Sequence, residues 1–175
     1  VIGVGTYAHL PGGLGNPYPD HEGLGQLTSP PHSARTFTTW LLEGYHNPNK
    51  PLGSVELLIS EPGDSAYQLP GGAEVPVETA TFSHTEAAIL QWFARGNSDP
   101  DNLLIFYAGH GNRLDTGGSE IGYWLPANAE RPPRNTYWVA NEFVTGHLSR
   151  IKAKRVLVVA DSCYAGLLSR EPSFL

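Results

Sequence analysis

The feature that most constrains the fold of this chain is a set of four short apolar runs, at residues 1–4, 55–59, 103–107 and 156–160. In each run apolar residues, many of them β-branched, follow one another almost without polar interruptions. A nearly continuous apolar run of this length is typical of a strand that is covered on both faces. We therefore expect the four runs to be strands of a buried, mostly parallel sheet.

Helical patterns separate these runs. Apolar residues recur at intervals of three and four over 34–44, after Pro30 and Pro31, and again over 87–93, after a capping box that Ser83 and Glu86 would form. A third such pattern spans 141–151. Strands that alternate with helices of this length predict right-handed crossovers. The predicted fold class is therefore α/β, a three-layer sandwich whose mostly parallel sheet lies between helices.

Three long segments break the alternation, at 9–31, 61–81 and 112–137, and all are rich in Gly, Pro and polar residues. Loops of this length in a compact domain are usually functional. At least two of them leave the carboxyl end of a predicted strand, where open α/β sheets place their sites. With 175 residues, 40% of them hydrophobic, the chain is expected to form one domain over 1–175.

The composition excludes several classes of protein. Eleven Lys and Arg stand against 17 Asp and Glu, the net charge is -6 and no basic run is present, so direct binding of nucleic acid is not expected. No apolar stretch reaches the roughly 18 residues of a membrane span. Cys163 is the single cysteine, which excludes an internal disulfide and a thiolate cluster and is typical of a reducing compartment. We expect a cytoplasmic protein that makes no membrane contact.

The segment from Gly3 to Ala8 matches a loose dinucleotide-binding fingerprint. Such a fingerprint works only where a helix follows at once, so that its N-terminal amides face the pyrophosphate. Here Pro11 opens a stretch rich in Gly and Pro instead. We therefore interpret the segment as a glycine-rich strand end that packs closely against its neighbours, and we expect no nucleotide cofactor.

Two of the predicted strands lead into residues that are suited to catalysis. The run at 103–107 is followed by His110, which lies between two glycines, and the run at 156–160 is followed by Cys163. If these strands are parallel neighbours, a thiol nucleophile and an imidazole meet at the carboxyl edge of the sheet. The Gly111 amide would then point at a developing oxyanion, and a helix beginning after Cys163 would lower the pKa of the thiol.

Taken singly, these residues have ordinary structural explanations. A lone cysteine is most often a small buried hydrophobe, and a lone histidine is usually a surface residue or a hydrogen-bonded core residue. Asp161, two residues before Cys163, would serve as the N-cap of the following helix. The equivalent strand-end positions of His110 and Cys163 favour the catalytic interpretation of the pair.

Two motifs surround this pair, Phe-Tyr-Ala-Gly-His-Gly at 106–111 and Asp-Ser-Cys-Tyr-Ala-Gly at 161–166. Together they resemble the caspase and metacaspase superfamily of cysteine peptidases, since a Cys signature with its His about 50 residues upstream is the caspase pattern. The second motif is more similar to metacaspases and bacterial caspase-like proteins than to animal caspases. The likeness covers nearly the whole chain and corresponds to the large subunit, so the small-subunit strands are expected to be absent from it.

The resemblance implies a cysteine endopeptidase that works through a thioester acyl-enzyme. Cys163 would attack the scissile carbonyl, His110 would protonate the leaving amine and then activate water, and the amides of Gly111 and Cys163 would hold the oxyanion. A backbone carbonyl commonly orients the His, so no third side chain is implied. The implied partners are a protein or peptide substrate, a small-subunit segment, and regulatory sensor or adaptor domains within a longer protein. Autoprocessing is one explanation for a chain that ends at Leu175.

The resemblance also bears on specificity. In metacaspases the Asp two residues before the Cys helps to bind a substrate Arg or Lys, and Asp161 matches it. The family's second acid precedes the Ala of the first helix, whereas Ser33 stands there in this chain. Asp20 or Glu22, in the preceding loop, could substitute for it.

Many metacaspases also bind calcium, and here Asp115 and Glu120 are the only acids near the His motif that could serve. Hard cations need several oxygen ligands close together. We therefore expect neither a metal nor a cofactor. The favoured hypothesis is a caspase-like thiol protease, a hydrolase, and the alternative is a catalytically silent caspase-like scaffold or binding module. A scaffold would have no reason to keep both Cys163 and His110.

Overall fold

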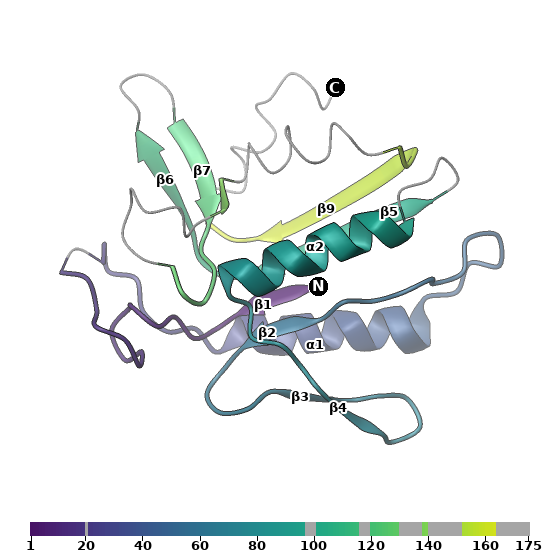
Figure 1. The fold of residues 1–175 in the computed structure, drawn as a ribbon, viewed down its shortest axis with the longest axis horizontal. Helices are drawn as coiled ribbons and strands as arrows, with labels where there is room; N and C mark the ends of the chain where they lie inside the picture. The colour runs from purple at the N-terminus through teal and green to yellow at the C-terminus, as the bar shows by residue number, and fades with distance from the viewer. Residues whose placement is uncertain (20, 97–100, 116–119, 130–137, 140–151, 164–175) are drawn as a thin grey trace.

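The computed structural model describes residues 1–19, 21–96, 101–115, 120–129, 138–139 and 152–163, and a four-stranded parallel sheet lies at its centre (Figure 1). The strands are β1 (Ile2–Val4), β2 (Leu58–Ser60), β5 (Asn102–Ala108) and β9 (Arg155–Asp161). They lie in the order β2-β1-β5-β9, and each pairing between neighbours is parallel. All four apolar runs therefore contribute to one sheet, as predicted, although only Leu58 and Ile59 of the run at 55–59 lie in β2.

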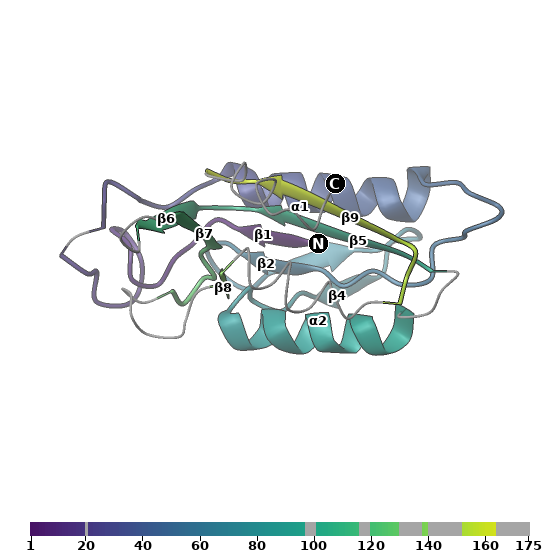
Figure 2. The same ribbon diagram turned by 90° about the horizontal axis from the view of Figure 1, so that it is seen from above.

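Helices cover both faces of this sheet (Figure 2). On one face lies α1 (Ser29–Thr39), which a π-helical turn (Trp40–Gly44) continues, and on the other face lies α2 (Phe82–Gly96). The predicted α/β class, with a parallel sheet between helices, is confirmed. None of the helices in the described ranges is long and apolar enough to cross a membrane.

Successive residues of β5 belong to two separate hydrophobic cores. Phe106 and Ala108 pack with Ala34 beneath α1, where the rings of Phe37 and Phe106 stack with their centroids 4.6 Å apart. The opposite face holds a larger cluster beneath α2, whose buried members include Ile2, Val4, Leu58, Ile89, Ile105 and Tyr107. Because both faces of β5 are covered, this strand needs the uninterrupted apolar sequence that it has.

The fourth strand, β9, is less covered than the prediction requires. It pairs with β5 from Arg155 to Asp161, yet the side chain of Leu157 is 55% exposed. Among the described residues β9 has β5 as its one strand neighbour, so it forms an edge of the sheet. The expectation of burial on both faces is therefore met only in part for this strand.

The first helix begins earlier than its apolar pattern indicates. Since α1 begins at Ser29, Pro30 and Pro31 lie in its first turn, where a missing N–H costs no helical hydrogen bond. The helix also packs very closely on β1. A Cβ atom at Gly3 would lie 2.6 Å from the Cβ of Ala34 and 2.7 Å from the Pro30 carbonyl oxygen. The glycine-rich strand end thus packs tightly, as predicted.

The second helix is capped one residue before it begins. It starts at Phe82, and the Oγ1 of Thr81 accepts the His84 amide at 3.3 Å. The predicted capping box of Ser83 and Glu86 is therefore wrong, because Ser83 already lies inside the helix. The asparagine that accepts the Phe82 amide is far along the chain, so the sequence pattern could not show this start.

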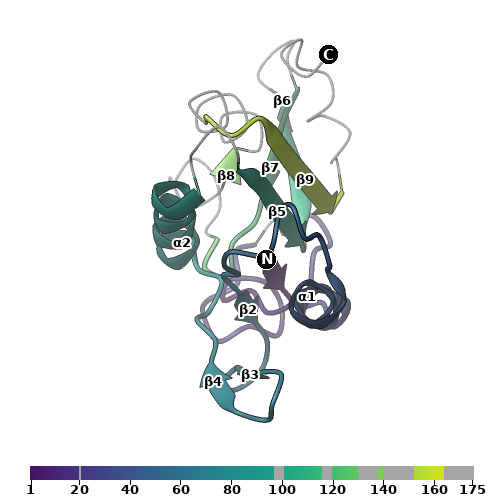
Figure 3. The ribbon, with the colours of Figure 1, turned by 90° about the vertical axis from the view of Figure 1, so that its right-hand side faces the viewer.

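Two of the long segments contain small antiparallel sheets that the sequence did not predict. In the first, β3 (Ala66–Gln68) and β4 (Glu74–Pro76) form a hairpin that projects beyond β2 (Figure 3). Around the second, at 112–137, the strands β6 (Gly111–Asp115), β7 (Glu120–Trp124) and β8 (Trp138–Val139) form a three-stranded sheet that follows the carboxyl end of β5 (Figure 3). The interpretation of both segments as irregular loops is thus wrong in part. The third predicted helix, at 141–151, lies outside the described residues.

Candidate active site

The carboxyl ends of β5 and β9 bring the two predicted catalytic segments together. Ala108 pairs with Asp161 at the end of the ladder, and the Gly109 amide donates to the Asp161 carbonyl oxygen at 3.2 Å. The chain continues from there to His110 on one side and to Cys163 on the other. The expectation that the two strands are parallel neighbours is therefore confirmed, and both residues follow the same edge of the sheet.

Gly111 lies directly against the main chain of Cys163. A Cβ atom built on Gly111 would fall 2.1 Å from the Cys163 carbonyl oxygen and 3.1 Å from the Oγ of Ser162. No side chain fits at so short a distance, which explains why glycine follows His110. Cys163 is itself a free, exposed cysteine. The helix predicted to begin after Cys163 lies outside the described residues.

A main-chain oxygen orients the imidazole of His110. The Nε2 of His110 lies 2.7 Å from the Gly25 carbonyl oxygen and donates its proton to it. A neutral imidazole that is protonated at Nε2 keeps a lone pair on Nδ1, which is then the atom that can accept a proton. The contact is of the backbone-carbonyl kind that the resemblance implied. Sequence analysis named no residue for it, because any residue carries a carbonyl.

Burial lowers the pKa of His110 below its ordinary value of 6.5, and the hydrogen bond to Gly25 opposes this shift. Burial is the larger of the two causes. It lowers the pKa because an imidazolium loses more hydration than a neutral ring when water is excluded. At neutral pH the ring is therefore uncharged and able to take a proton from a neighbouring thiol.

The loop that carries Gly25 is fixed by the side chain of Gln26, a residue that sequence analysis missed. Its Oε1 accepts the Tyr7 amide at 2.7 Å, and its Nε2 donates to the carbonyl oxygens of Tyr7 at 3.1 Å, Pro11 at 3.0 Å and Leu10 at 3.3 Å. Tyr7 follows the carboxyl end of β1, at the same edge of the sheet as His110. The Gln26 side chain thus fastens the loop at 9–31 beside the candidate site.

The predicted oxyanion donor Gly111 is free of the β6–β7 ladder on its N–H side. Gly111 stands opposite Trp124, and the ladder bond beside this pair runs from the Leu125 amide to the His110 carbonyl oxygen at 3.1 Å. In an antiparallel ladder this pattern makes Gly111 and Trp124 a non-hydrogen-bonded pair, so the Gly111 N–H points away from β7. Since the main chain of Cys163 packs on the same glycine, this amide lies beside the segment that carries the thiol.

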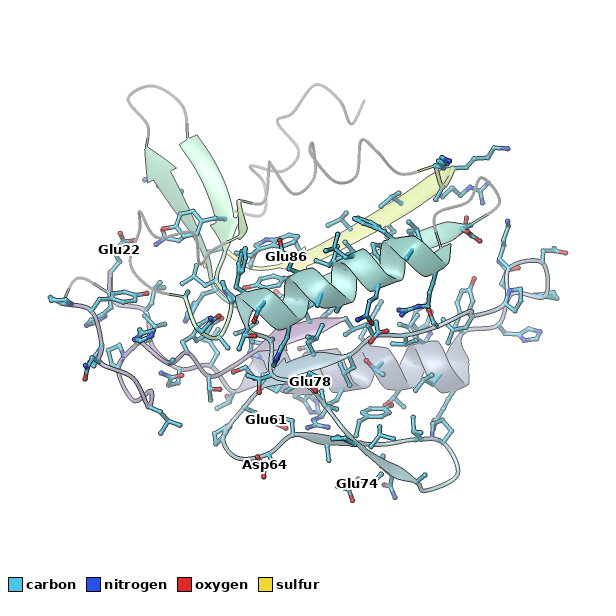
Figure 4. All side chains as sticks on the ribbon, viewed as in Figure 1. Glu22, Glu61, Asp64, Glu74, Glu78 and Glu86 are labelled. Carbon is cyan, nitrogen blue, oxygen red and sulfur yellow. The ribbon has the colours of Figure 1, made fainter. Side chains whose placement is uncertain are left out.

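Two acidic residues lie near this edge. Asp161 is exposed at the end of β9, and the helix that it would cap falls outside the described residues. Glu22 reaches the site from the first long loop, where its Oε2 accepts the Nδ2 of Asn112 at 2.7 Å. Figure 4 shows Glu22 on the loop beside the base of β6, apart from Glu61 and Asp64. Asp20, the other candidate acid, is not among the described residues.

The described residues hold no group of three or more His, Cys, Asp or Glu side chains that could share a metal ion. Asp115 and Glu120, the two acids considered for calcium, stand opposite each other in the β6–β7 ladder. Two such positions are fewer ligands than a calcium ion takes. The predicted absence of a metal remains a prediction.

Comparisons of the chain with protein-family models, with curated proteins and with solved structures found no match. A functional assignment therefore rests on the geometry of the strand ends and on the motifs that follow them.

Proposed function

We propose that this chain is the large-subunit portion of a caspase-like cysteine endopeptidase, with Cys163 as the nucleophile and His110 as the acid–base residue. The observation that carries the proposal is the meeting of two strand ends. The ladder between β5 and β9 runs up to Ala108 and Asp161, and Gly111 then packs on the main chain of Cys163. An exposed thiol and an imidazole held through Nε2 thus follow adjacent strands.

The same residues account for each step of peptide-bond hydrolysis. The Sγ of Cys163 forms a bond to the scissile carbonyl carbon while its proton passes to Nδ1 of His110. The carbonyl electrons move onto oxygen, to which the amides of Gly111 and Cys163 donate. Collapse of this intermediate breaks the C–N bond, and the proton held by His110 goes to the leaving amine. The product of this half-reaction is a thioester between Cys163 and the acyl part of the substrate.

Hydrolysis of the thioester reverses these roles. His110 takes a proton from water, and the water oxygen attacks the thioester carbonyl. The C–S bond then breaks, the proton returns to sulfur, and a carboxylic acid leaves. An imidazole whose pKa lies below 6.5 is uncharged at neutral pH, which suits the step in which it removes a proton.

We further infer that the peptidase prefers Arg or Lys before the cleaved bond. Asp161 and Glu22 place two carboxylates around the strand ends, and a substrate guanidinium would form charge-assisted hydrogen bonds with them. Glu22 takes the part of the second acid that the first helix lacks. The net charge of -6 adds a weak, general attraction for basic peptides.

The proposed enzyme also requires partners. Leu157 is 55% exposed on β9, which is an edge strand within the described part of the chain. We propose that small-subunit strands continue the sheet beyond β9, and that sensor or adaptor domains of a longer cytoplasmic protein regulate cleavage. An open edge of this length is otherwise prone to pairing with other chains.

A peptide-library cleavage profile of the full-length protein tests the proposal. Cys163→Ala and His110→Ala are each expected to abolish turnover, whereas His32→Ala, at an exposed position on α1, should leave it unchanged. Turnover that persists in Cys163→Ala would reject the nucleophile. If the wild-type protein cleaves nothing and its thiol reacts with iodoacetamide no faster than a free exposed thiol, the silent scaffold is the better description.

The specificity is tested in the same assay with conservative variants. Asp161→Asn and Glu22→Gln are each expected to lower kcat/KM for Arg and Lys substrates roughly tenfold, the size of one lost charge-assisted hydrogen bond, with little change for neutral residues. An unchanged substrate profile for Asp161→Asn would return that residue to helix capping.

A further inference from the structure

We propose that Tyr7 is the positioning residue for His110, holding the imidazole so that Nδ1 stays available to the thiol. The inference rests on the proposed function and extends it to a residue outside both catalytic motifs. Tyr7 is 1% exposed, and its hydroxyl accepts the His110 amide at 2.7 Å while donating to the Val4 carbonyl oxygen at 3.0 Å.

The hydroxyl of Tyr7 provides a hydrogen-bond acceptor just beyond the end of the sheet. The Gly109 amide bonds to β9, and successive amides of a strand point to opposite sides, so the His110 amide faces the side of β1. The pairing of β1 with β5 has already ended at Gly3 and Ala108, so this amide needs another acceptor. A buried N–H without a partner costs about 1–3 kcal/mol. By accepting this N–H, Tyr7 lets the chain leave the sheet at His110 without that cost, and fixes the direction in which it leaves.

Tyr107 holds the other side of the same residue. Its hydroxyl lies 2.9 Å from the His110 carbonyl oxygen and 3.0 Å from that of Leu125, so its one proton is shared between them. A Cβ atom at Gly109 would fall 2.8 Å from the Tyr107 hydroxyl and 2.9 Å from the Tyr7 hydroxyl. The two phenols therefore enclose the main chain just before His110, and glycine at 109 makes room for both.

Tyr7 also reaches the His110 ring and its acceptor. The two rings lie with centroids 4.9 Å apart, tilted by 38°. The main chain of Tyr7 is held by Gln26 through both its N–H and its carbonyl oxygen, and Gln26 adjoins the Gly25 carbonyl that receives Nε2. Tyr7 thus contacts the amide and the ring of His110 directly, and it is linked through Gln26 to the loop that carries the Gly25 acceptor.

The phenols are suited to a fixed role. Burial raises the pKa of both Tyr7 and Tyr107 above the ordinary value of 10.0. Both hydroxyls therefore stay protonated over the pH range in which a peptidase works, and neither exchanges a proton with substrate. Their contribution is to the geometry of His110.

The test compares Tyr7→Phe with Tyr67→Phe. Each change removes one hydroxyl from a buried tyrosine, but the Tyr67 hydroxyl bonds Thr39 beneath the β3–β4 hairpin, away from His110. In the full-length protein, Tyr7→Phe is expected to lower kcat roughly 10- to 100-fold with KM nearly unchanged, because a misplacement of about 1 Å has effects of this size. Tyr67→Phe should lose stability without losing kcat. Equal kcat in Tyr7→Phe and wild type would overturn the proposal.

A second measurement separates this inference from the proposed function. In the Cys163→Ala background, nitrogen chemical shifts of His110 report which ring nitrogen carries the proton. We expect an Nε2–H ring in Cys163→Ala and a mixture of tautomers when Tyr7→Phe is added. If the protein proves not to be a peptidase, this readout still decides whether Tyr7 positions His110. An unchanged Nε2–H signal in a folded double variant would refute it.

If Tyr7→Phe does not fold, Tyr107→Phe takes its place. The His110 carbonyl oxygen would keep the Leu125 amide as a donor, so a milder variant with a smaller loss of kcat is expected. No loss of kcat and no change in the tautomer for this variant would overturn the role of the phenol pair.

Discussion

The contact between Gly111 and Cys163 can be perturbed by a single methyl group. In Gly111→Ala the added Cβ would begin 2.1 Å from the Cys163 carbonyl oxygen, whereas real Cβ contacts stay above 3.0 Å. The opposing atom is main chain and cannot rotate away. Relief therefore requires the segment after β5 and the segment after β9 to separate by about 0.9 Å, a distance that no side-chain adjustment can supply.

This separation predicts two effects of different size. Overpacking of this kind destabilises a protein by about 1–3 kcal/mol, which lowers the melting temperature by roughly 2–4 °C for each kcal/mol in a domain of this length. The effect on turnover should be larger, because moving a nucleophile by about 1 Å relative to its acid–base partner costs on the order of 100-fold in rate. We therefore expect Gly111→Ala to remain folded at 25 °C and to have lost most of its activity.

Gly53→Ala is the matched control, because a Cβ atom there would meet no atom within 4 Å and the position is exposed. Both variants are measured by thermal melting and by peptide cleavage in the full-length protein, well below the melting temperature. Gly53→Ala should match the wild type in both assays. If Gly111→Ala also keeps wild-type kcat/KM, the close approach of the two strand ends is not what makes the site, and the reasoning fails.

Two further predictions concern the loop and the imidazole. Gln26→Ala removes the hydrogen bonds that fasten the loop to the N–H and the carbonyl oxygen of Tyr7. We expect it to lower the free energy of unfolding by about 1–3 kcal/mol in denaturant, and to lower kcat because the Gly25 acceptor is released. An unaltered kcat would mean that the loop holds Gly25 without Gln26. For His110 the folded protein keeps the pKa below 6.5 while the unfolded chain has it near 6.5, so the unfolded state binds more protons in that range and the free energy of unfolding falls as pH is lowered below 6.5. Urea unfolding at pH 7.5 and 5.5 should show this loss in the wild type and a smaller one in His110→Asn, and an identical loss in both would exclude His110 as its source.

The sheet and the meeting of the two strand ends could be predicted because they follow from local patterns. A nearly continuous apolar run identifies a buried strand without knowledge of its neighbours, and parallel strands must share a carboxyl edge. His110 and Cys163 each follow such a run within three residues of the strand's end. Their proximity therefore needed one assumption only, that β5 and β9 are neighbours, and the structure bears it out.

The contacts that hold His110 could not be predicted, because they join residues far apart in the sequence. Tyr7 and His110 are separated by 103 positions, and Gly25 and His110 by 85. The predicted start of α2 was wrong for a similar reason, since the Phe82 amide donates to Asn128, 46 positions away. A signal for Tyr7 did exist: it is an aromatic residue just beyond the carboxyl end of β1, at the edge where the site lies.

That His110 leans on a carbonyl oxygen has a consequence for how variation at this site would be interpreted. A Cβ atom at Gly25 would meet no atom within 4 Å, so other amino acids can stand there and present the same oxygen. Alanine scanning would thus show no effect at position 25, and related proteins would be free to differ there. The main-chain partner of the proposed catalytic pair would therefore be invisible to mutagenesis and to alignment, and would be recognised only from the path of the backbone.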